Sequence, residues 1–305
     1  MSMKGQNIFA GRQILVLGAG YVGAAVVARC LREGAQVTAL TRNPQTCSEL
    51  ATLGAHCVQA DLAGEVWHAL VEAADYVLVC VGSGGGGVES YRRSYVGGLA
   101  SVRRWLAGHR VDTLVYTSST SVYPQGGGAL VTEDSPVASG SEDSAGILAE
   151  AERSILAPTE GLRRAFVLRL AGIYGPGRHG FLDRMREGGG PLPGEASGHL
   201  NLIHRDDIVS AVLACWAAPA EVGTRVFNLA DEGRATRGEI AAWLAARIGA
   251  PDTGFSGQAA AGRRRLTPDR IVSAEAIRDV LGWRPAFPSF REGYEALLRG
   301  EVSPH

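Results

Sequence analysis

Residues 14–23 read ILVLGAGYVG, an apolar run followed by a G-x-G-x-x-G pattern. Gly18 permits a tight turn, Gly20 lets the backbone approach a pyrophosphate, and Gly23 lets a helix pack closely against the preceding strand. The N–H groups at the start of that helix would face the phosphates. Because the pattern follows a predicted strand and opens a predicted helix, it indicates a dinucleotide-binding turn rather than a Gly-rich turn with a structural role alone.

Strands and helices are predicted to alternate over the first part of the chain. Apolar, β-rich runs are separated by helical patterns, and this alternation is typical of a parallel sheet covered on both faces. We therefore predict an α/β fold, a Rossmann-type doubly wound parallel sheet with a smaller C-terminal substrate lobe. The predicted strands span residues 14–17, 36–40, 76–81, 113–117 and 165–170, and the predicted helices span residues 21–32, with Gly34 as the C-cap, and 145–156.

The pattern changes after residue 170, because residues 172–198 are rich in Gly and Pro and predict mostly loop. Beyond them the sequence predicts helices over residues 208–217, 238–248 and 273–281, the last with Ser273 as its N-cap, and one last strand over residues 226–229. Three Gly runs, at residues 84–87, 126–128 and 188–190, are predicted to be loops that line the ligand crevice or plain surface loops. The predicted Rossmann domain spans residues 1–172, with 201–230 returning to it, and the predicted substrate lobe spans residues 173–200 and 231–305.

The residues after the second predicted strand select the cofactor. Proteins that bind NAD usually place an Asp or Glu there, which bonds the ribose 2′-hydroxyl. This chain has Thr41 and Arg42 instead. No carboxylate would repel a 2′-phosphate, and a guanidinium can pair with it bidentately. The sequence therefore favours NADP over NAD, and the alternative is that Arg42 is a solvated loop cation.

Further motifs follow in order along nearly the whole chain. They read ADL at residues 60–62, TSSTSVY at 117–123, LRLAGIYGPG at 168–177, LIHRDDI at 202–208 and LGWRP at 281–285. With them the chain resembles the extended short-chain dehydrogenase/reductases, also called the NAD-dependent epimerase/dehydratase family. The resemblance implies an NAD(P) cofactor, a small-molecule substrate and a homodimer formed through helices of the large domain. It implies cofactor contacts from Gly18, Gly20, Tyr21, Val22, Gly23, Arg42, Asp61, Leu62, Val81, Gly82 and Leu170.

The chain departs from the family pattern at the catalytic positions. Alignment on Glu152 places Ser144 at the Tyr, and Leu148 at the Lys, of the family's Tyr-x-x-x-Lys. Leu17 also replaces the first Gly of the family's loop, and Gly172 replaces an Asn. A tyrosine beside a cationic lysine has a lowered pKa and can pass a proton to or from a substrate oxygen, whereas an unaided serine and a leucine cannot. The chain is thus similar to an atypical branch that keeps the upstream Ser but lacks the Tyr–Lys pair.

Ser119 is the catalytic residue that the resemblance implies, since its hydroxyl could bond a substrate oxygen. The alternative is a strand-end hydroxyl that satisfies backbone groups. His204 and Tyr123 are expected to be structural, and the sequence has no metal-ligand spacing and no Ser–His–Asp order. Acidic residues near the lost pair are speculative substitute acids, although some must lie on a solvated helix face: Glu142, Asp143, Glu150 and Glu152.

Composition excludes several classes of partner. The 305 residues carry a formal net charge of −1, so no general basic field attracts nucleic acid or an anionic membrane. The basic cluster at residues 263–265 indicates a solvated loop, or else a site for a substrate phosphate. No apolar run reaches the length of a membrane span. The cysteines form no C-x-x-C pair, so we expect neither a zinc site nor a disulfide framework, and reduced buried thiols indicate a cytoplasmic protein: Cys30, Cys47, Cys57, Cys80 and Cys215.

Two classes of function remain open. The first is an NADP-dependent oxidoreductase or epimerase/dehydratase-like enzyme that acts on a sugar-nucleotide-like or small carbonyl substrate. The second is a catalytically inactive relative that binds NADP as a sensor or regulatory protein. A hydroxyacid-type dehydrogenase is a weaker third interpretation, because the later motifs argue against it. An enzyme should gather polar groups near the nicotinamide, whereas a sensor can leave that end of the crevice apolar.

Overall fold

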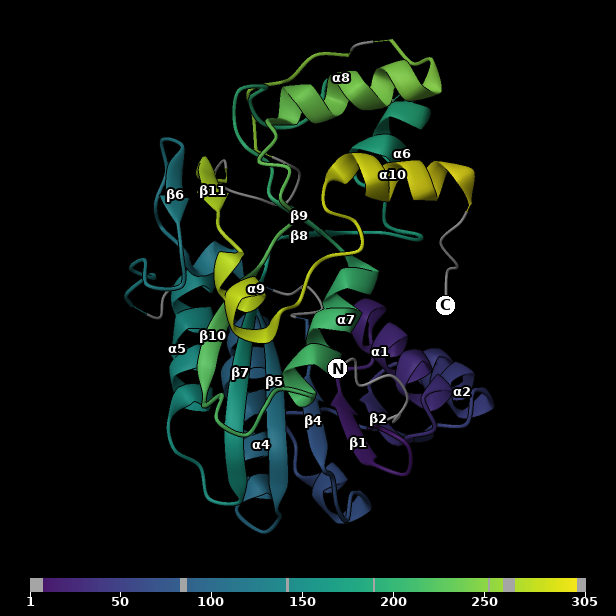
Figure 1. Ribbon diagram of the computed structural model, residues 1–305, viewed down its shortest axis with the longest axis vertical. Helices are drawn as coiled ribbons and strands as arrows, with labels where there is room; N and C mark the ends of the chain where they lie inside the picture. Colours follow the sequence, from purple (N-terminus) through teal and green to yellow (C-terminus); the bar gives the residue numbers. More distant parts are fainter. Residues whose placement is uncertain are drawn as a thin grey trace, which may run out of the picture.

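The computed structural model describes residues 8–82, 87–140, 143–188, 190–251, 253–259 and 267–300. Its centre is a seven-stranded sheet, all parallel, with the order β10-β7-β5-β4-β1-β2-β3 (Figure 1). The strands are β1 (Gln13–Leu17), β2 (Gln36–Thr41), β3 (His56–Gln59), β4 (Tyr76–Val79), β5 (Val111–Ser119), β7 (Leu162–Leu170) and β10 (Arg225–Leu229).

The chain enters this sheet at an inner strand and winds outward twice. β1, β2 and β3 lead to one edge, and β4, β5, β7 and β10 then lead to the other. Leu17 at the end of β1 therefore lies between Leu40 of β2 and Val79 of β4. Connections that leave neighbouring strands in opposite directions open a crevice at the carboxyl ends of those strands. The predicted α/β, Rossmann-type doubly wound sheet is confirmed.

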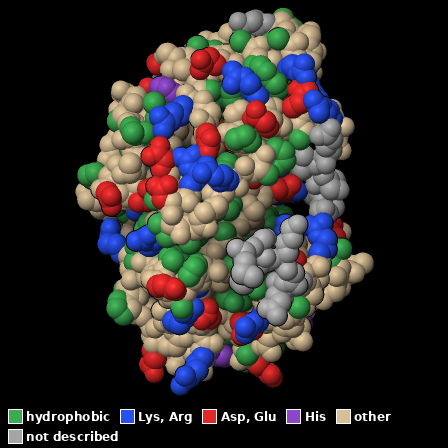
Figure 2. Space-filling view, viewed as in Figure 1, with side chains coloured by type: hydrophobic (Ala, Val, Ile, Leu, Met, Phe, Trp, Pro, Cys, Tyr) green, Lys and Arg blue, Asp and Glu red, His purple; other side chains and the backbone are tan. Residues whose placement is uncertain are grey.

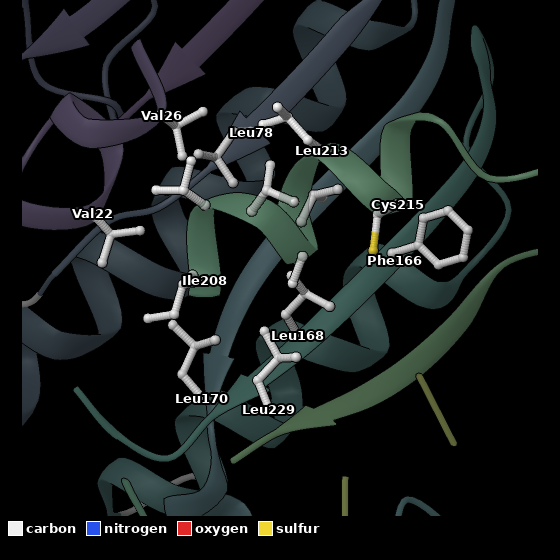
Figure 3. Packing of buried hydrophobic residues seen from close by; sticks show 14 of the residues in the cluster. Val22, Val26, Leu78, Phe166, Leu168, Leu170, Ile208, Leu213, Cys215 and Leu229 are labelled. Atoms are coloured by element: carbon white, nitrogen blue, oxygen red, sulfur yellow. The ribbon is translucent and has the colours of Figure 1, made fainter. Parts of the chain in front are cut away.

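Apolar layers cover both faces of the sheet, because successive side chains on a strand point to opposite faces. Ile14 and Val16 of β1 belong to the layer with α1 and α7, and Leu15 and Leu17 belong to the layer with α4 and α5. Figure 3 shows the first layer, in which side chains of α1 and α7 meet those of β4, β7 and β10. The helices that build these layers are α1 (Tyr21–Arg32), α4 (Gly98–Leu106), α5 (Ser144–Leu156) and α7 (Arg205–Trp216).

Further elements lie beyond the carboxyl ends of the central strands (Figure 1). Two small parallel sheets pair β8 (Gly172–Tyr174) with β9 (Leu202–His204), and β6 (Ala129–Val131) with β11 (Arg270–Val272). A separate apolar cluster is formed by α6, α8, α10 and neighbouring loops. The division of the chain into a Rossmann domain and a substrate lobe stays a prediction. The remaining helices are α2 (Pro44–Thr52), α3 (Gly87–Arg92), α6 (Phe181–Arg186), α8 (Arg237–Ile248), α9 (Glu275–Leu281) and α10 (Phe290–Arg299).

Several predicted boundaries need correction. The helix predicted to begin at Ser273 begins at Glu275, and its N-cap residue is Ala274 rather than Ser273. The Ser273 hydroxyl still accepts the Glu275 N–H, at 3.3 Å, although Ser273 lies one residue before the cap. The cap of α1 is Glu33, and Gly34 follows it with a φ of 75°. Residues 172–198, predicted as mostly loop, also hold β8 and α6. β8, α6 and α9 have only 3, 6 and 7 residues, so their patterns are weak in sequence.

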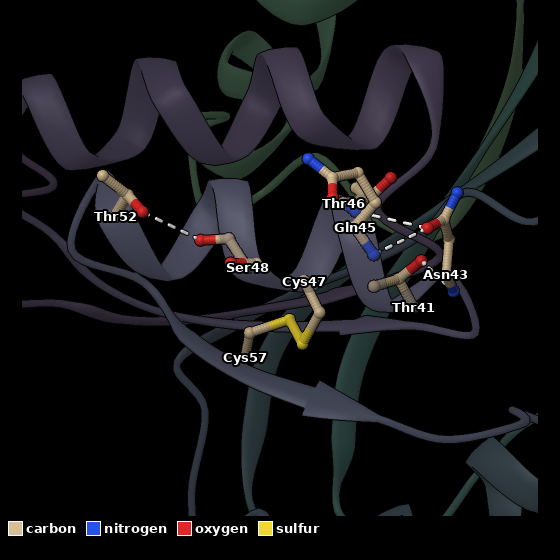
Figure 4. Close-up of a disulfide and its surroundings, with 8 residues drawn as sticks. All are labelled: Thr41, Asn43, Gln45, Thr46, Cys47, Ser48, Thr52 and Cys57. Atoms are coloured by element: carbon tan, nitrogen blue, oxygen red, sulfur yellow. Dashed lines mark hydrogen bonds between the residues drawn. A yellow bond between two sulfur atoms is a disulfide. The ribbon is translucent and has the colours of Figure 1, made fainter.

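The expectation of no disulfide is wrong. Cys47 on α2 and Cys57 on β3 are joined by a disulfide, with their Cα atoms 5.5 Å apart (Figure 4). α2 packs beside β3, the strand that follows it in sequence, so two cysteines that are ten residues apart come together (Figure 4). No C-x-x-C spacing is needed for this pairing, which is why the sequence pattern missed it. Cys30, Cys80 and Cys215 are free.

The surface in view carries mixed charges. Figure 2 shows Lys or Arg side chains interspersed with Asp and Glu over this face. Within the described residues, no helix combines the length and apolarity needed to cross a bilayer. The arginine cluster at residues 263–265 lies outside the described residues.

A buried polar network ties α5 to the sheet. Glu152 of α5 accepts hydrogen bonds from Arg169 of β7, at 2.7 to 3.1 Å, and from the Ser118 hydroxyl of β5 at 2.5 Å. Arg169 also donates to the Tyr123 hydroxyl at 2.7 Å, which in turn donates to Asn228 of β10 at 2.8 Å. Glu152 and Arg169 are 3% and 5% exposed as side chains, so neither charge has water as an alternative partner. The network fixes Tyr123 in the structural role that the sequence predicts.

We expect Glu152→Ala to lower the free energy of unfolding by about 3–5 kcal/mol, because it leaves the Arg169 charge buried without its partner. Glu150→Ala, two positions away on the same helix, removes only the half-exposed pair with Arg92 and should cost about 0–1 kcal/mol. Urea unfolding of both variants measures the difference. Equal losses would mean that the buried pair contributes no more than the surface pair.

Candidate functional site

A continuous cleft runs along the carboxyl ends of the central strands. It consists of a cavity of about 240 Å³ beside β2 and β3 and a cavity of about 730 Å³ beside β5 and β7. The two share Gly20, Cys80, Val81 and Gly82, so they join over the ends of β1 and β4. That junction is the point where the strand order reverses, the usual place for a ligand in such sheets.

The structure brings nearly all of the predicted cofactor residues to this cleft. Gly23 lines neither cavity, because it packs beneath the turn. The roles of the predicted residues as cofactor contacts stay predictions. The smaller cavity takes Gly18, Gly20, Arg42, Asp61, Leu62, Val81 and Gly82, and the larger takes Gly20, Tyr21, Val22, Val81, Gly82, Leu170 and the predicted catalytic Ser119.

The turn between β1 and α1 is packed against two strands. Gly18 has a φ of 100°, and a Cβ there would overlap the carbonyl of Cys80, next to β4. A Cβ on Gly23 would overlap the carbonyl of Gly18. Gly20, by contrast, has no atom within 4 Å of an added Cβ, and its φ of −85° suits any residue. The space above Gly20 is therefore open to a ligand, and no side chain caps the first turn of α1.

Arg42 and Asp61 both line the smaller cavity. Partial burial acts to raise the pKa of Asp61, but hydrogen bonds from Arg93 at 2.7 Å and from the Ala63 N–H at 3.0 Å hold that pKa below its ordinary value. Arg42 is exposed, and its charge acts in the same direction. The next residue, Asn43, caps α2 by accepting the Gln45 N–H at 2.9 Å (Figure 4). The end of β2 thus offers an exposed cation and no carboxylate of its own.

Ser119 ends β5 on the wall of the larger cavity. Its hydroxyl oxygen accepts the Ser121 N–H at 3.1 Å, and this contact caps the short 3₁₀ turn over Thr120–Val122. The oxygen keeps a proton to donate, so the backbone contact and a substrate contact are compatible. The neighbouring Ser118 also lines this cavity, but its hydroxyl donates to Glu152 at 2.5 Å.

The two positions at which the sequence alignment expects the family's Tyr–Lys pair carry no acid or base. Ser144 is the exposed first residue of α5, and Leu148 is buried with its side chain on the wall of the larger cavity. Two tyrosines that the sequence analysis did not single out line the same cavity: Tyr91 of α3 and Tyr95, with ring centroids 4.5 Å apart. Burial raises the pKa of Tyr95, so its hydroxyl stays protonated. Their spacing of four residues is the signal in the sequence that places both rings on one side of a helix.

None of the substitute acids that the structure describes lines the larger cavity. Asp143 caps α5 through the Gly146 N–H, Glu150 pairs with Arg92, and Glu152 belongs to the buried network. Glu142 lies outside the described residues.

His204 is also accounted for structurally. Its Nδ1 accepts the Asp206 N–H at 3.2 Å as the cap of α7, and burial lowers its pKa to about 4. Asp207 accepts N–H groups of Ala286 and Phe287 at 2.6 and 3.2 Å. In the part of the chain that the structure describes, no group of His, Cys, Asp and Glu could hold a metal ion.

The far wall of the larger cavity is cationic. Arg178, Arg237 and Arg270 line it, and no Asp or Glu does so among the described residues. The sequence analysis did not identify these arginines, because they come from three separate segments that meet only in the fold.

The profile of the NAD dependent epimerase/dehydratase family matches residues 14–230. Among curated proteins, the chain is 28% identical to "Protein YeeZ" of Escherichia coli (strain K12), over 59% of this chain and 60% of that protein. It is 31% identical to the "3-diazoavenalumate denitrifying reductase" of Streptomyces sp, over 56% of this chain and 59% of that protein. The chain therefore matches about three fifths of the length of each relative.

Solved structures show the same fold. "MoeE5 in complex with UDP-glucuronic acid and NAD" superposes with a TM-score of 0.79 at 22% identity, over 96% of this chain and 100% of that chain. A functionally unknown conserved protein from Silicibacter pomeroyi DSS superposes with a TM-score of 0.76 at 24% identity, with the same coverage. At these identities the likeness establishes the fold alone.

We expect Gly18→Ala to destabilise the protein by at least about 1–3 kcal/mol, since it combines an unfavourable φ with overlap of the Cys80 carbonyl. Gly20→Ala should change stability by no more than about 1 kcal/mol, because its Cβ enters open space. It should nevertheless abolish dinucleotide binding if a pyrophosphate occupies that space. Urea unfolding and NADPH titration separate the two effects, and a Gly20→Ala variant that binds NADPH normally would contradict this placement.

Proposed function

This chain belongs to the NAD dependent epimerase/dehydratase family, and from that premise we propose that it is an NADP-dependent oxidoreductase or epimerase with a sugar-nucleotide-like or small carbonyl substrate. The observation that carries the cofactor choice is that Arg42, directly after β2, borders the smaller cavity, while Asp61, which follows β3, is already engaged by Arg93. A 2′-phosphate placed there would meet a guanidinium and no unpaired carboxylate from β2.

The proposed chemistry rests on Ser119. Its hydroxyl would donate a hydrogen bond to the substrate oxygen, while the apolar Leu148 and the protonated Tyr95 would shield the reacting atoms from water. The bound dinucleotide would supply or accept the hydride. The proton would come from a nearby tyrosine or an ordered water, since the described carboxylates near α5 are bound elsewhere. Positioning alone can supply much of the barrier reduction, so slow or substrate-restricted turnover is the expected outcome.

The second candidate is a catalytically inactive NADP-binding sensor. The uncharged Leu148 and the exposed Ser144 favour it, because they leave the nicotinamide end without the family's acid. The polar far wall of the larger cavity favours an enzyme instead, since a sensor needs no polar substrate pocket. The reductase name of the Streptomyces relative supports the enzyme as well. A homodimer and a cytoplasmic location are part of this proposal and stay predictions.

Arg42→Ala tests the cofactor choice. Calorimetry of the unmutated protein should show tighter binding of NADPH than of NADH. The variant should narrow that difference by about 1.5–3 kcal/mol, the contribution of a hydrogen bond to a charged group. The control is Arg32→Ala, because Arg32 is an exposed arginine at the end of α1 that lies away from the glycine turn. This variant should leave the difference in affinity between NADPH and NADH unchanged. Equal affinity for both cofactors in the unmutated protein would remove Arg42 from cofactor selection.

Ser119→Ala tests the chemistry. We expect the rate of hydride transfer to fall by about 10- to 1000-fold, as when one positioned hydrogen bond to the reacting oxygen is lost, with NADPH affinity little changed. Ser118→Ala is the matched control, because its hydroxyl bonds Glu152 and its loss should lower stability rather than rate. Unaltered turnover in Ser119→Ala would exclude Ser119 from the mechanism. A broad carbonyl and sugar-nucleotide screen with no NADPH oxidation by the unmutated protein would favour the sensor.

A further inference from the structure

Arg270 is a buried cation without a counter-charge. It lies in β11 and is 5% exposed, yet the structure records no ion pair for it among the described residues. Its Nη1 atom is buried and has no hydrogen-bond partner in the described part of the chain. Burial lowers the pKa of the guanidinium, and no carboxylate acts to raise it. A buried charge without a partner costs stability, so its position calls for an explanation.

The other deeply buried arginines are fully engaged. Arg164, 4% exposed, donates to the Thr113 hydroxyl and to the carbonyls of Ala218, Pro219 and Val222, at 2.6 to 3.1 Å. Arg169 is paired with Glu152, and Arg205, 4% exposed, is paired with Asp206. Arg270 differs from these three because it borders the larger cavity.

The backbone around Arg270 is held firmly. Asn201 donates to the Arg270 carbonyl at 2.9 Å and accepts the Val272 N–H at 2.8 Å. The adjacent Asp269 cannot neutralise the guanidinium, because it accepts both the N–H and the ring Nδ1 of His199 at 2.8 Å. The cation is therefore positioned by the fold rather than carried on a loose loop.

A second arginine stands on the same wall. Arg237 is the first residue of α8, a helix of 12 residues whose N-terminus carries a partial positive charge. Its side chain packs over Gly194, where an added Cβ would lie 3.2 Å from the Arg237 Cδ and Nε atoms. Arg237 and Arg270 line only the larger cavity, on the side away from Arg42 and Asp61.

We propose that Arg270, together with Arg237, binds a carboxylate or phosphate group of the substrate, so that this protein acts on an anion held with its reacting carbon toward Ser119. A planar guanidinium pairs bidentately with either group. The bound anion supplies the partner that the folded chain lacks, and the absence of Asp and Glu from the described cavity wall leaves the attraction unopposed. The proposal rests on the proposed function for the reaction, but the anion site itself is measurable without turnover.

The test is calorimetric titration of sodium phosphate and of sodium acetate into protein saturated with NADP⁺, at an ionic strength held constant with sodium chloride. Saturating NADP⁺ occupies any position that binds the phosphates of the dinucleotide, so the titrated anion cannot bind there. The unmutated protein should bind one anion per chain, and the stronger of the two identifies the group. Arg270→Gln should weaken that binding at least about tenfold, whereas Arg270→Lys should retain part of it. Arg270→Gln should also unfold at the same temperature as the unmutated protein or higher, since it removes an unpaired buried charge.

The matched control is Arg164→Gln, which should unfold at a lower temperature because it breaks satisfied hydrogen bonds. Arg225→Gln, at the exposed start of β10, should bind anions as the unmutated protein does. Equal anion binding by Arg270→Gln, or no anion binding by the unmutated protein, would overturn the proposal. Loss of NADPH binding in Arg270→Gln would also overturn it, because the arginine would then serve the cofactor. Anion binding that depends on Arg270 in a protein that fails to bind NADPH would support the site and refute the proposed cofactor.

Discussion

The arrangement depends on one tight turn, wedged between two strands. The N–H groups of Gly18 and Ala19 both donate to the Leu40 carbonyl at 3.0 and 2.9 Å, and the Cys80 N–H donates to the Leu17 carbonyl at 2.8 Å. The turn is thus bound to β2 on one side and to the end of β4 on the other. These bonds use the first two amides of the turn and leave those of α1 facing the cleft. Because β1, β2 and β4 end at one level, both cavities open along a single edge.

α5 borders the cleft with a polar anchor and an apolar face. Bonds from Arg169 and Ser118 to Glu152 hold the helix against the sheet, and the residues one and two turns earlier are Leu148 and Ser144. The larger cavity therefore has walls of different character. Its wall near α5 is apolar at Leu148, whereas β11, α8 and the end of β5 contribute polar side chains.

Local periodicity predicted much of the fold. The helix over Tyr21–Arg32 and the strands that lead to Leu17 and Leu170 follow the sequence pattern within a few residues, because burial on a regular element repeats in sequence. The disulfide between Cys47 and Cys57 and the setting of Arg270 did not follow from it. Both depend on how separate segments pack. Nothing in the sequence around Arg270 distinguishes it from a surface arginine, and its burial follows from the pairing of β11 with β6.

The disulfide has a consequence for the unfolded chain as well. It closes a loop of about ten residues, and a crosslink of that kind stabilises a protein mainly by restricting the conformations open to the denatured ensemble, to the extent of about 2–3 kcal/mol for short loops. The loop that it closes holds residues 47–52 of α2 and the first two residues of β3. On either side of this loop, Asn43 and Asp61 line the smaller cavity. Reduction of this bond would therefore return conformational entropy to the denatured chain and lower the free energy of unfolding, while leaving the folded contacts beside the cavity in place.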